Sequence, residues 1–99
     1  MMQNDPAPMK LRVPDDIATL IRGCHPLLKR KIRAGLRHIV AEPDTGKALK
    51  DELQELQSYR VGKFRIIYRC TPKHIIEIIA IGPRKSIYEE TYRILRKQL

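Results

Sequence analysis

Large aromatic residues and cysteines are scarce in this chain of 99 residues, which has no tryptophan, one phenylalanine and two cysteines. The hydrophobic fraction of 42% consists largely of isoleucine, leucine and valine, so we expect an aliphatic core. A chain of this length can bury one modest core but not two. We therefore predict a single domain over residues 9–99, preceded by a polar, proline-broken and disordered lead over residues 1–8.

The two cysteines, Cys24 and Cys70, lie far apart and form no CxxC pattern. We expect both to be small, buried apolar side chains. The three histidines, His25, His38 and His74, are equally scattered, without a second ligand at helical or hairpin spacing. Structural zinc sites need several such ligands at close spacing. We therefore expect neither a metal site nor another cofactor.

Long apolar runs are also missing: no stretch of about 18 apolar residues could span a membrane. The N-terminal sequence MMQNDPAP lacks the apolar centre of a secretory signal. We therefore expect a cytoplasmic protein without a membrane partner.

Acidic residues are few, since 11 Asp and Glu stand against 20 Lys and Arg and the net charge is +9. Residues 22–38 contain six Lys and Arg and no acid, and residues 58–99 contain ten basic residues and three acids. A basic surface attracts anionic polymers because each neutralised phosphate releases condensed counterions. The charge therefore indicates a nucleic-acid partner, or an acidic partner that neutralises the chain.

Hydrophobic periodicity predicts the element order β-α-α-β-β-β-α. Asp15 or Asp16 can cap the first helix, and Pro43 ends the second. The apolar run at 74–81 indicates a strand that is buried on both faces. The expected strands and helices cover residues 9–13, 14–23, 26–42, 58–61, 63–70, 74–81 and 87–99, with a turn at 44–46 and a short helix or loop at 47–56.

This order predicts an α+β fold: a small antiparallel sheet packed against an N-terminal helical hairpin, with a C-terminal helix. The hairpin covers one face of the sheet. Few large apolar residues remain for the other face, so we expect that face to stay open and to carry arginines. The basic residues of the second helix are either solvated or attract phosphate groups: Lys29, Arg30, Arg33 and Arg37.

The candidate site lies between Tyr59 and Tyr88, where arginines interrupt apolar strands and a Gly-Pro-Arg-Lys turn follows the last strand. Guanidinium groups match phosphate oxygens in shape and stay charged. The same residues also have structural interpretations: Arg65 could pair with Glu77, Arg84 and Lys85 could be surface charges, and Tyr88 could pack the last helix on the sheet. The other tyrosines and cations of this stretch are expected in the sheet (Tyr59, Tyr68) or in solvent (Arg69, Lys73).

The segments YRVGKFRIIY (59–68) and IIEIIAIGPRKSIYEE (75–90) follow a basic helical hairpin that breaks at Glu42-Pro43. In this order they resemble the RelE/ParE superfamily of bacterial toxin–antitoxin toxins, and the likeness covers nearly everything from Met9 onward. The resemblance implies a compact toxin whose sheet is the working surface. It also implies a cognate antitoxin that wraps the toxin and covers this surface, in a complex that we expect to be oligomeric.

Members of this superfamily differ in target: RelE-like toxins cut mRNA in the ribosomal A site, whereas ParE-like toxins poison DNA gyrase. The resemblance implies RelE-type catalytic residues at Arg65 on a strand, Arg84 after the last strand and Tyr88 at the start of the C-terminal helix. Some RelE-like toxins carry two further basic residues on the neighbouring strand. Here Arg60 fits one of these positions, and the other falls on Ser58.

The predicted function is a ribosome-dependent mRNA endonuclease that inhibits translation. The RNA 2′-OH attacks the adjacent phosphate without a metal and leaves a 2′,3′-cyclic phosphate and a 5′-OH. Arg65 and Arg84 would stabilise the charged phosphorane, and Tyr88, Lys63 or Lys85 would transfer protons. The residues expected to bind RNA are Arg60, Lys63 and Lys85. Two alternatives are a ParE-like inhibitor of DNA gyrase and a non-catalytic RNA- or ribosome-binding module.

Overall fold

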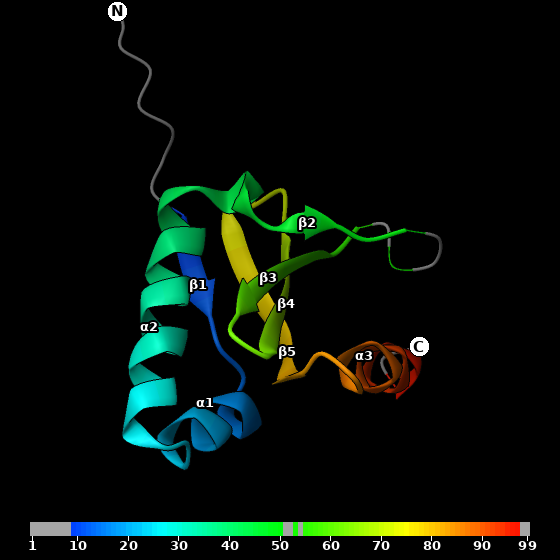
Figure 1. Cartoon of the computed structure of the whole chain (residues 1–99). Coiled ribbons are helices and arrows are strands. Elements are labelled where there is room, and N and C mark those ends of the chain that lie inside the picture. Colours follow the sequence, from blue (N-terminus) through cyan, green and yellow to red (C-terminus); the bar gives the residue numbers. More distant parts are fainter. Residues whose placement is uncertain (1–8, 51–52, 54, 98–99) are drawn as a thin grey trace, which may run out of the picture.

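The computed structural model describes residues 9–50, 53 and 55–97 (Figure 1). The lead that the sequence predicts at residues 1–8 lies outside this part of the chain. Within the described residues, no helix is both long enough and apolar enough to cross a membrane.

The elements follow the predicted order with one additional short strand, which lies where the sequence indicates a short helix or loop. The helices are α1 (Asp15–Arg22), α2 (Pro26–Ala41) and α3 (Ile87–Lys97), and a short 3-10 turn, η1 (Pro43–Thr45), follows α2. The strands are β1 (Lys10–Arg12), β2 (Lys47–Ala48), β3 (Gln57–Val61), β4 (Phe64–Cys70) and β5 (Ile75–Pro83).

The strands form one sheet in the order β1-β5-β4-β3-β2. The neighbouring strands β2 and β3, β3 and β4, and β4 and β5 pair antiparallel. β1 pairs with β5 as a parallel strand at the edge of the sheet. The predicted α+β class is therefore confirmed. β5 lies inside the sheet and is buried on both faces, as the sequence predicts, because Ile76 and Ile78 belong to one core and Ile79 and Ala80 to another.

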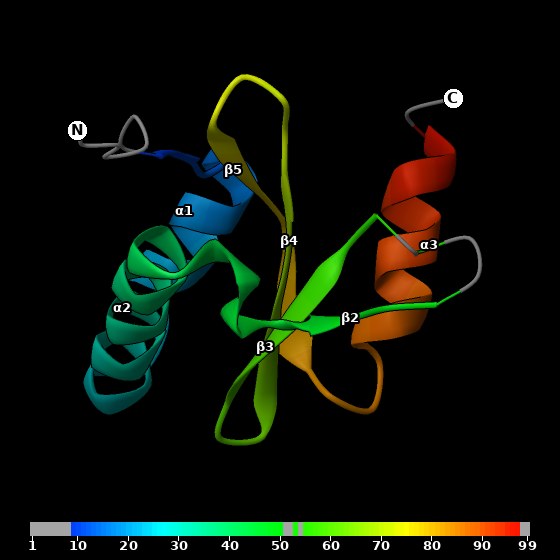
Figure 2. The ribbon, with the colours of Figure 1, turned by 90° about the horizontal axis from the view of Figure 1, so that it is seen from above.

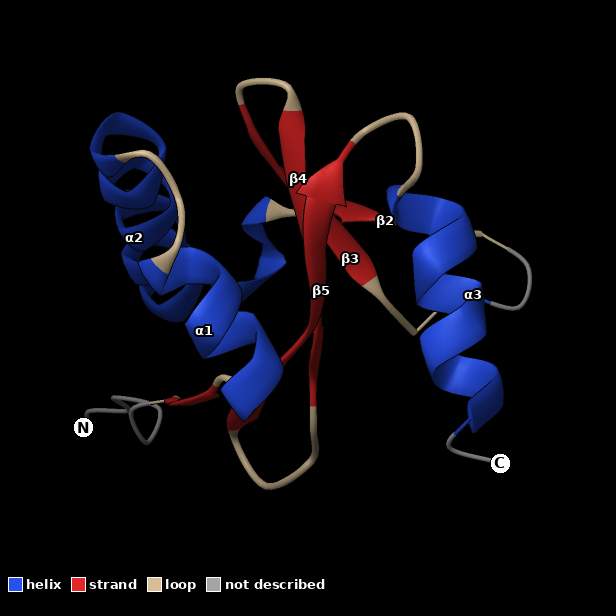
Figure 3. Cartoon of the chain, turned by 90° about the horizontal axis from the view of Figure 1, so that it is seen from below, coloured by secondary structure: helices blue, strands red, loops and turns tan. Residues whose placement is uncertain are grey.

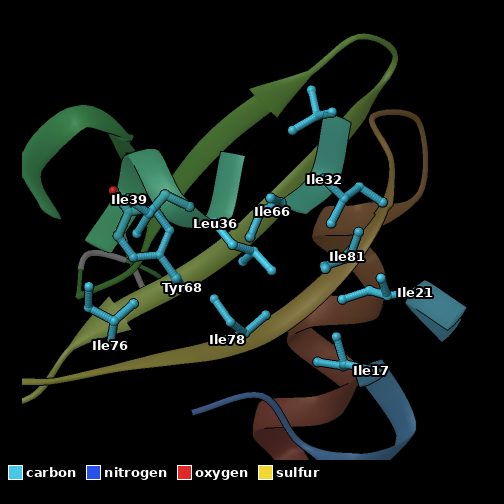
Figure 4. Packing of buried hydrophobic residues seen from close by; sticks show 11 residues of the cluster. Ile17, Ile21, Ile32, Leu36, Ile39, Ile66, Tyr68, Ile76, Ile78 and Ile81 are labelled. Carbon is cyan, nitrogen blue, oxygen red and sulfur yellow. The ribbon is translucent and has the colours of Figure 1, made fainter. Parts of the chain in front are cut away.

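The first core fills the space between the sheet and the α1–α2 hairpin (Figure 4). α2 buries Ile32, Leu36 and Ile39 because their spacing places them on one side of the helix. Gly35 lies on the same side and lets the helix approach β3 closely. A Cβ at this position would lie 2.9 Å from Cε1 of Tyr59 and 3.2 Å from Cγ2 of Val61.

The second face of the sheet is covered by α3, so the prediction of an open face is wrong (Figures 2 and 3). Ile67 of β4 and Ile79 and Ala80 of β5 point to this side and form a second core with Leu53, Leu56 and Ile87. Thr91 of α3 is buried, and Ile94 and Leu95 pack against the same core. Side chains alternate along a strand, so the apolar strands β4 and β5 place apolar side chains on both faces of the sheet. Each face therefore needs helices packed against it.

Two local expectations are also wrong. Neither Asp15 nor Asp16 caps α1, because Pro14 is the N-cap residue and makes no side-chain hydrogen bond; the two carboxylates lie in the first turn, where they face the positive end of the helix dipole. Cys70 is exposed and Cys24 is half-buried, rather than both being buried. Cys70 is the last residue of β4, beside the β4–β5 turn, and belongs to neither hydrophobic core.

Tyr68 ties the sheet to the turn after α2. Its side chain is fully buried, and its hydroxyl donates to the Pro43 carbonyl at 2.7 Å and accepts from the Gly46 N–H at 2.9 Å. A Cβ on Gly46 would lie 2.6 Å from this hydroxyl, so the bond requires glycine there. The expectation that Tyr68 is a sheet residue is confirmed.

We expect Tyr68→Phe to lower the free energy of unfolding by about 1–3 kcal/mol, because two backbone groups lose their buried partner. Urea denaturation followed by circular dichroism measures this loss. Phe64→Leu, which changes an apolar side chain without touching this hydrogen-bond pair, serves as a control for ordinary repacking. An unchanged denaturation midpoint for Tyr68→Phe would show that water replaces the hydroxyl at no cost.

Burial raises the pKa of the Tyr68 phenol above its ordinary value of 10.0. The folded state therefore favours the neutral phenol, whereas the unfolded chain ionises it near pH 10. The stability that Tyr68 contributes is complete below that pH and is lost as the pH rises through the folded pKa. We expect the melting temperature of the wild type to fall more steeply above about pH 10 than that of Tyr68→Phe, and parallel profiles would contradict this.

Candidate functional site

A cationic hollow of about 290 Å³ lies at one end of the sheet. It is lined by Arg60, Gly62, Lys63, Arg65, Pro83, Arg84 and Lys85. Two segments far apart in the sequence form it, the β3–β4 turn and the connection from β5 to α3, which lie at the same end of the sheet (Figure 2). The N–H of Arg84 donates to the Lys63 carbonyl at 3.0 Å and so joins the two segments.

The β3–β4 turn positions two of the arginines. Val61 and Phe64 are paired across a two-residue turn, and Gly62 has a φ of +59°, which glycine adopts without steric cost. One pair further along, Arg60 lies directly opposite Arg65. Residues opposite each other in an antiparallel ladder share a face, so the two guanidinium groups repel each other unless an anion lies between them.

The arginines of the hollow face the α3 side of the sheet. Gly35 of α2 lies against Tyr59, Val61 and Ile66, so these three side chains face the α1–α2 hairpin. Neighbouring residues of a strand alternate between faces. Arg60 and Arg65 therefore point to the side on which α3 lies, at the end of the sheet beside the start of that helix.

The cations of the hollow have no acidic partner among residues 9–50, 53 and 55–97. Arg60 makes one weak contact, in which its Nε donates to the Gly62 carbonyl at 3.3 Å. Arg65 is half-buried, and Arg60, Lys63, Arg84 and Lys85 are exposed. Because guanidinium groups carry several donors in a fixed geometry, the hollow can accept a phosphate or carboxylate group.

Glu77 does not pair with Arg65, which disfavours the structural interpretation of that arginine. The β4–β5 register places Arg69 opposite Glu77 and Arg65 opposite Gly82. Nε and Nη2 of Arg69 both lie 2.6 Å from Oε1 of Glu77, and Nη1 of Arg12 lies 3.7 Å from Oε2. The expectation that Arg69 is only solvated is therefore wrong.

Tyr88 does not line the hollow. It is half-buried in the first turn of α3 and packs against the second core, which matches its structural interpretation. Ser58 is also away from the solvent, with an exposed fraction of 2%, and its Oγ has no hydrogen-bond partner within the described part of the chain. The structure thus brings Arg60, Lys63, Arg65, Arg84 and Lys85 together, and Tyr88 is not among the residues that line the hollow.

Sequence reasoning missed the two residues that shape the hollow without charge, Gly62 and Pro83. The signal for Gly62 was the Val-Gly-Lys-Phe turn between two strands, which indicates a tight hairpin. It also missed a contact on the opposite face of the sheet, where Nδ1 of His38 lies 2.9 Å from the Tyr59 hydroxyl and Nε2 lies 3.4 Å from Glu42. This contact joins α2 to β3. In the described residues, no group of three or more His, Cys, Asp or Glu side chains could hold a metal ion.

Comparisons with known proteins agree with this fold. Residues 14–88 match the family model described as "ParE toxin of type II toxin-antitoxin system, parDE". No curated protein matches the chain in sequence.

Several solved structures share the fold. The toxin–antitoxin complex RelBE2 from Mycobacterium tuberculosis gives a TM-score of 0.68 at 23% identity, over 79% of this chain and 100% of that one. A doubly substituted E. coli toxin RelE in the free state gives 0.72 at 11% identity, over 94% and 99%. The archaeal RelE–RelB complex from Pyrococcus horikoshii gives 0.61 at 18% identity, over 79% and 97%.

Proposed function

The chain belongs to the ParE toxin family, within the RelE/ParE superfamily of type II toxin–antitoxin toxins, and we propose that it cleaves mRNA on the ribosome by a RelE-type mechanism. Its substrate would be mRNA in the cytoplasm, and the effect would be inhibition of translation. The observation that carries this proposal is the cationic hollow, in which five basic side chains converge and none has an acidic partner within the described residues.

The hollow suits the phosphoryl step of RNA cleavage. When the 2′-OH attacks the adjacent phosphate, a new P–O bond forms, negative charge grows on the phosphorane, and the bond to the 5′-oxygen breaks. Arg65 is held in a strand, and the backbone of Arg84 is tied to Lys63. Fixed cations of this kind stabilise developing charge without having to reorganise during the reaction. We assign that role to Arg65 and Arg84.

Proton transfer is assigned to the lysines of the hollow rather than to Tyr88. Lys63 and Lys85 line it, whereas Tyr88 packs against the second core. Arginine stays protonated and cannot take the 2′-OH proton. A lysine can do so only in its neutral form, so weak cleavage of free RNA is expected. Positioning of the mRNA by the ribosome would supply much of the rate.

Inhibition of DNA gyrase is the second candidate function. The matching family model is that of ParE, and Tyr88, one of the three residues that favour RelE-type chemistry, packs against the second core. In this case the cationic hollow would bind an acidic surface of the target protein and would perform no chemistry.

The two functions are separated by mapping mRNA 5′ ends in a cell-free translation reaction, with and without ribosomes, beside a gyrase supercoiling assay. We expect cuts within A-site codons that require ribosomes, are lost in Arg65→Ala and persist in the control Lys73→Ala, which removes an exposed cation outside the hollow. Inhibited supercoiling with intact mRNA would instead establish the ParE-like function. Ribosome binding with neither effect would leave a non-catalytic binding module.

A further inference from the structure

The cationic hollow holds more positive charge than one RNA phosphate can neutralise. Its five cations come from the β3–β4 hairpin and from the segment between β5 and α3, which meet at one end of the sheet (Figures 1 and 2). Along an RNA strand, each phosphodiester carries a single negative charge and is separated from the next by a sugar. A phosphodiester in the hollow would therefore leave most of these cations without a counterion.

No carboxylate offsets this charge within the described part of the chain. The cations of the hollow take part in none of the ion pairs there, and Arg60 lies directly opposite Arg65 on the neighbouring strand. The carboxylates nearest along the chain do not line the hollow: Glu55, Glu89 and Glu90. Like charges directly opposite each other are destabilising. An anion of high charge density would relieve more of this repulsion than a phosphodiester does.

The lining of the hollow offers little with which to recognise a nucleobase. Apart from the cations it consists of Gly62 and Pro83. Phe64 packs against the first core and Tyr88 against the second, so neither ring lines the hollow. Unpaired bases are usually recognised by stacking on aromatic rings and by hydrogen bonds to their edges. The volume of about 290 Å³ is also at the lower limit of ordinary ligand pockets, which enclose about 300–1,000 Å³. The hollow therefore suits a short anionic chain without a base.

We propose that the hollow also binds a free linear polyphosphate chain and that this ligand excludes RNA from the site. The chain is either the 5′-triphosphate of a nucleotide or inorganic polyphosphate. Its phosphates are joined by single bridging oxygens, so several negative charges come within reach of both segments of the hollow. The arginines would contact phosphate oxygens in pairs, and the lysines would act as point charges.

This binding would regulate the site. By mass action, nucleoside triphosphates at high concentration would hold part of the toxin in a blocked state, and their depletion would release it. The binding depends on the hollow alone, whereas inhibition of mRNA cleavage rests on the proposed function.

Isothermal titration calorimetry of sodium tripolyphosphate with the full chain tests the binding, at constant ionic strength and without Mg²⁺. We expect a single molecule per chain, bound about tenfold or more tightly than orthophosphate. ATP and UTP should bind within about threefold of each other, because the base is not recognised, and AMP should bind as weakly as orthophosphate. Equal affinities for tripolyphosphate and orthophosphate, several molecules per chain, or a larger preference for one base would each overturn the proposal.

A pair of double variants locates the binding. Arg60→Ala/Lys85→Ala removes one cation from each segment of the hollow and should weaken tripolyphosphate binding by about tenfold or more. The matched control Arg30→Ala/Lys73→Ala removes an arginine and a lysine outside the hollow and should change the affinity by less than about threefold. All four side chains are exposed, so neither variant removes a buried contact. Equal losses would show that the ligand responds to net charge alone and would overturn the proposal.

A second measurement follows a fluorescein-labelled RNA oligonucleotide with 2′-O-methyl riboses, which cannot be cleaved by 2′-OH attack. Tripolyphosphate should displace this RNA from the wild type over the concentration range in which it fills the hollow. RNA that stays bound at saturating tripolyphosphate would refute the exclusion. If displacement succeeds but ribosome-bound mRNA is never cut, the proposed mRNA cleavage fails and this inference stands, because displacement requires no chemistry.

Discussion

Expression of Arg65→Ala is expected to leave cell growth unimpaired, while wild-type expression arrests it. The physical reason is that Arg65 is the cation of the hollow that is half-buried and held within a strand, opposite Arg60. Loss of one fixed group that stabilises transition-state charge typically costs about 10²–10³ in rate. Cleavage of ribosome-bound mRNA, measured by primer extension, should fall by a similar factor. Arg84→Ala should have the same direction of effect.

Fold integrity separates this result from simple unfolding. Arg65 makes no ion pair within the described residues, so its removal should leave the melting temperature near that of the wild type. Arg65→Lys tests whether bidentate contact with phosphate oxygens is required, because lysine keeps the positive charge but cannot make that contact. Full toxicity of both Arg65→Ala and Arg84→Ala would show that the hollow is not the working site.

Truncation after Glu89 is expected to destabilise the chain by about 3 kcal/mol or more, because it uncovers side chains that α3 buries and each contributes about 1.5–3 kcal/mol. Ile67 is fully buried and Ile79 is 5% exposed, and both lie beneath α3 in the second core. A loss of this size is a large fraction of the stability of a small domain. Thermal and urea denaturation measure it, and aggregation should accompany it because an apolar sheet face becomes exposed.

The matched control is Arg93→Ala/Arg96→Ala, which removes two exposed cations of α3 and no buried side chain. It should melt close to the wild type. If the truncated chain melted at the same temperature as the wild type, the second core would be stable without α3. The helix would then contribute to binding and not to stability.

Several features of the fold follow from local sequence alone. The 3.6-residue spacing of Ile32, Leu36 and Ile39 predicts α2, and the continuous apolar run of β5 predicts a strand with two buried faces. Pro43 marks the end of the second helix, since proline cannot continue it. These patterns depend on neighbours along the chain, which is why the element order was predictable.

Other features depend on contacts between distant residues. The pairing of Glu77 with Arg69 rather than Arg65 follows from the β4–β5 register, which includes a bulge between Ile67 and Tyr68. A bulge changes which residues lie opposite each other, and no local pattern marks it here. The parallel addition of β1 to β5 is equally a matter of tertiary packing.

The sequence by itself determined the charge, the element order apart from β2, and the five basic residues that line the hollow. Only the tertiary structure decided that α3 closes the second face and that Tyr88 packs against this second core. The physical reason is that a strand pattern shows that two faces are apolar but not which helix covers each of them. That choice depends on how the whole chain folds back on itself.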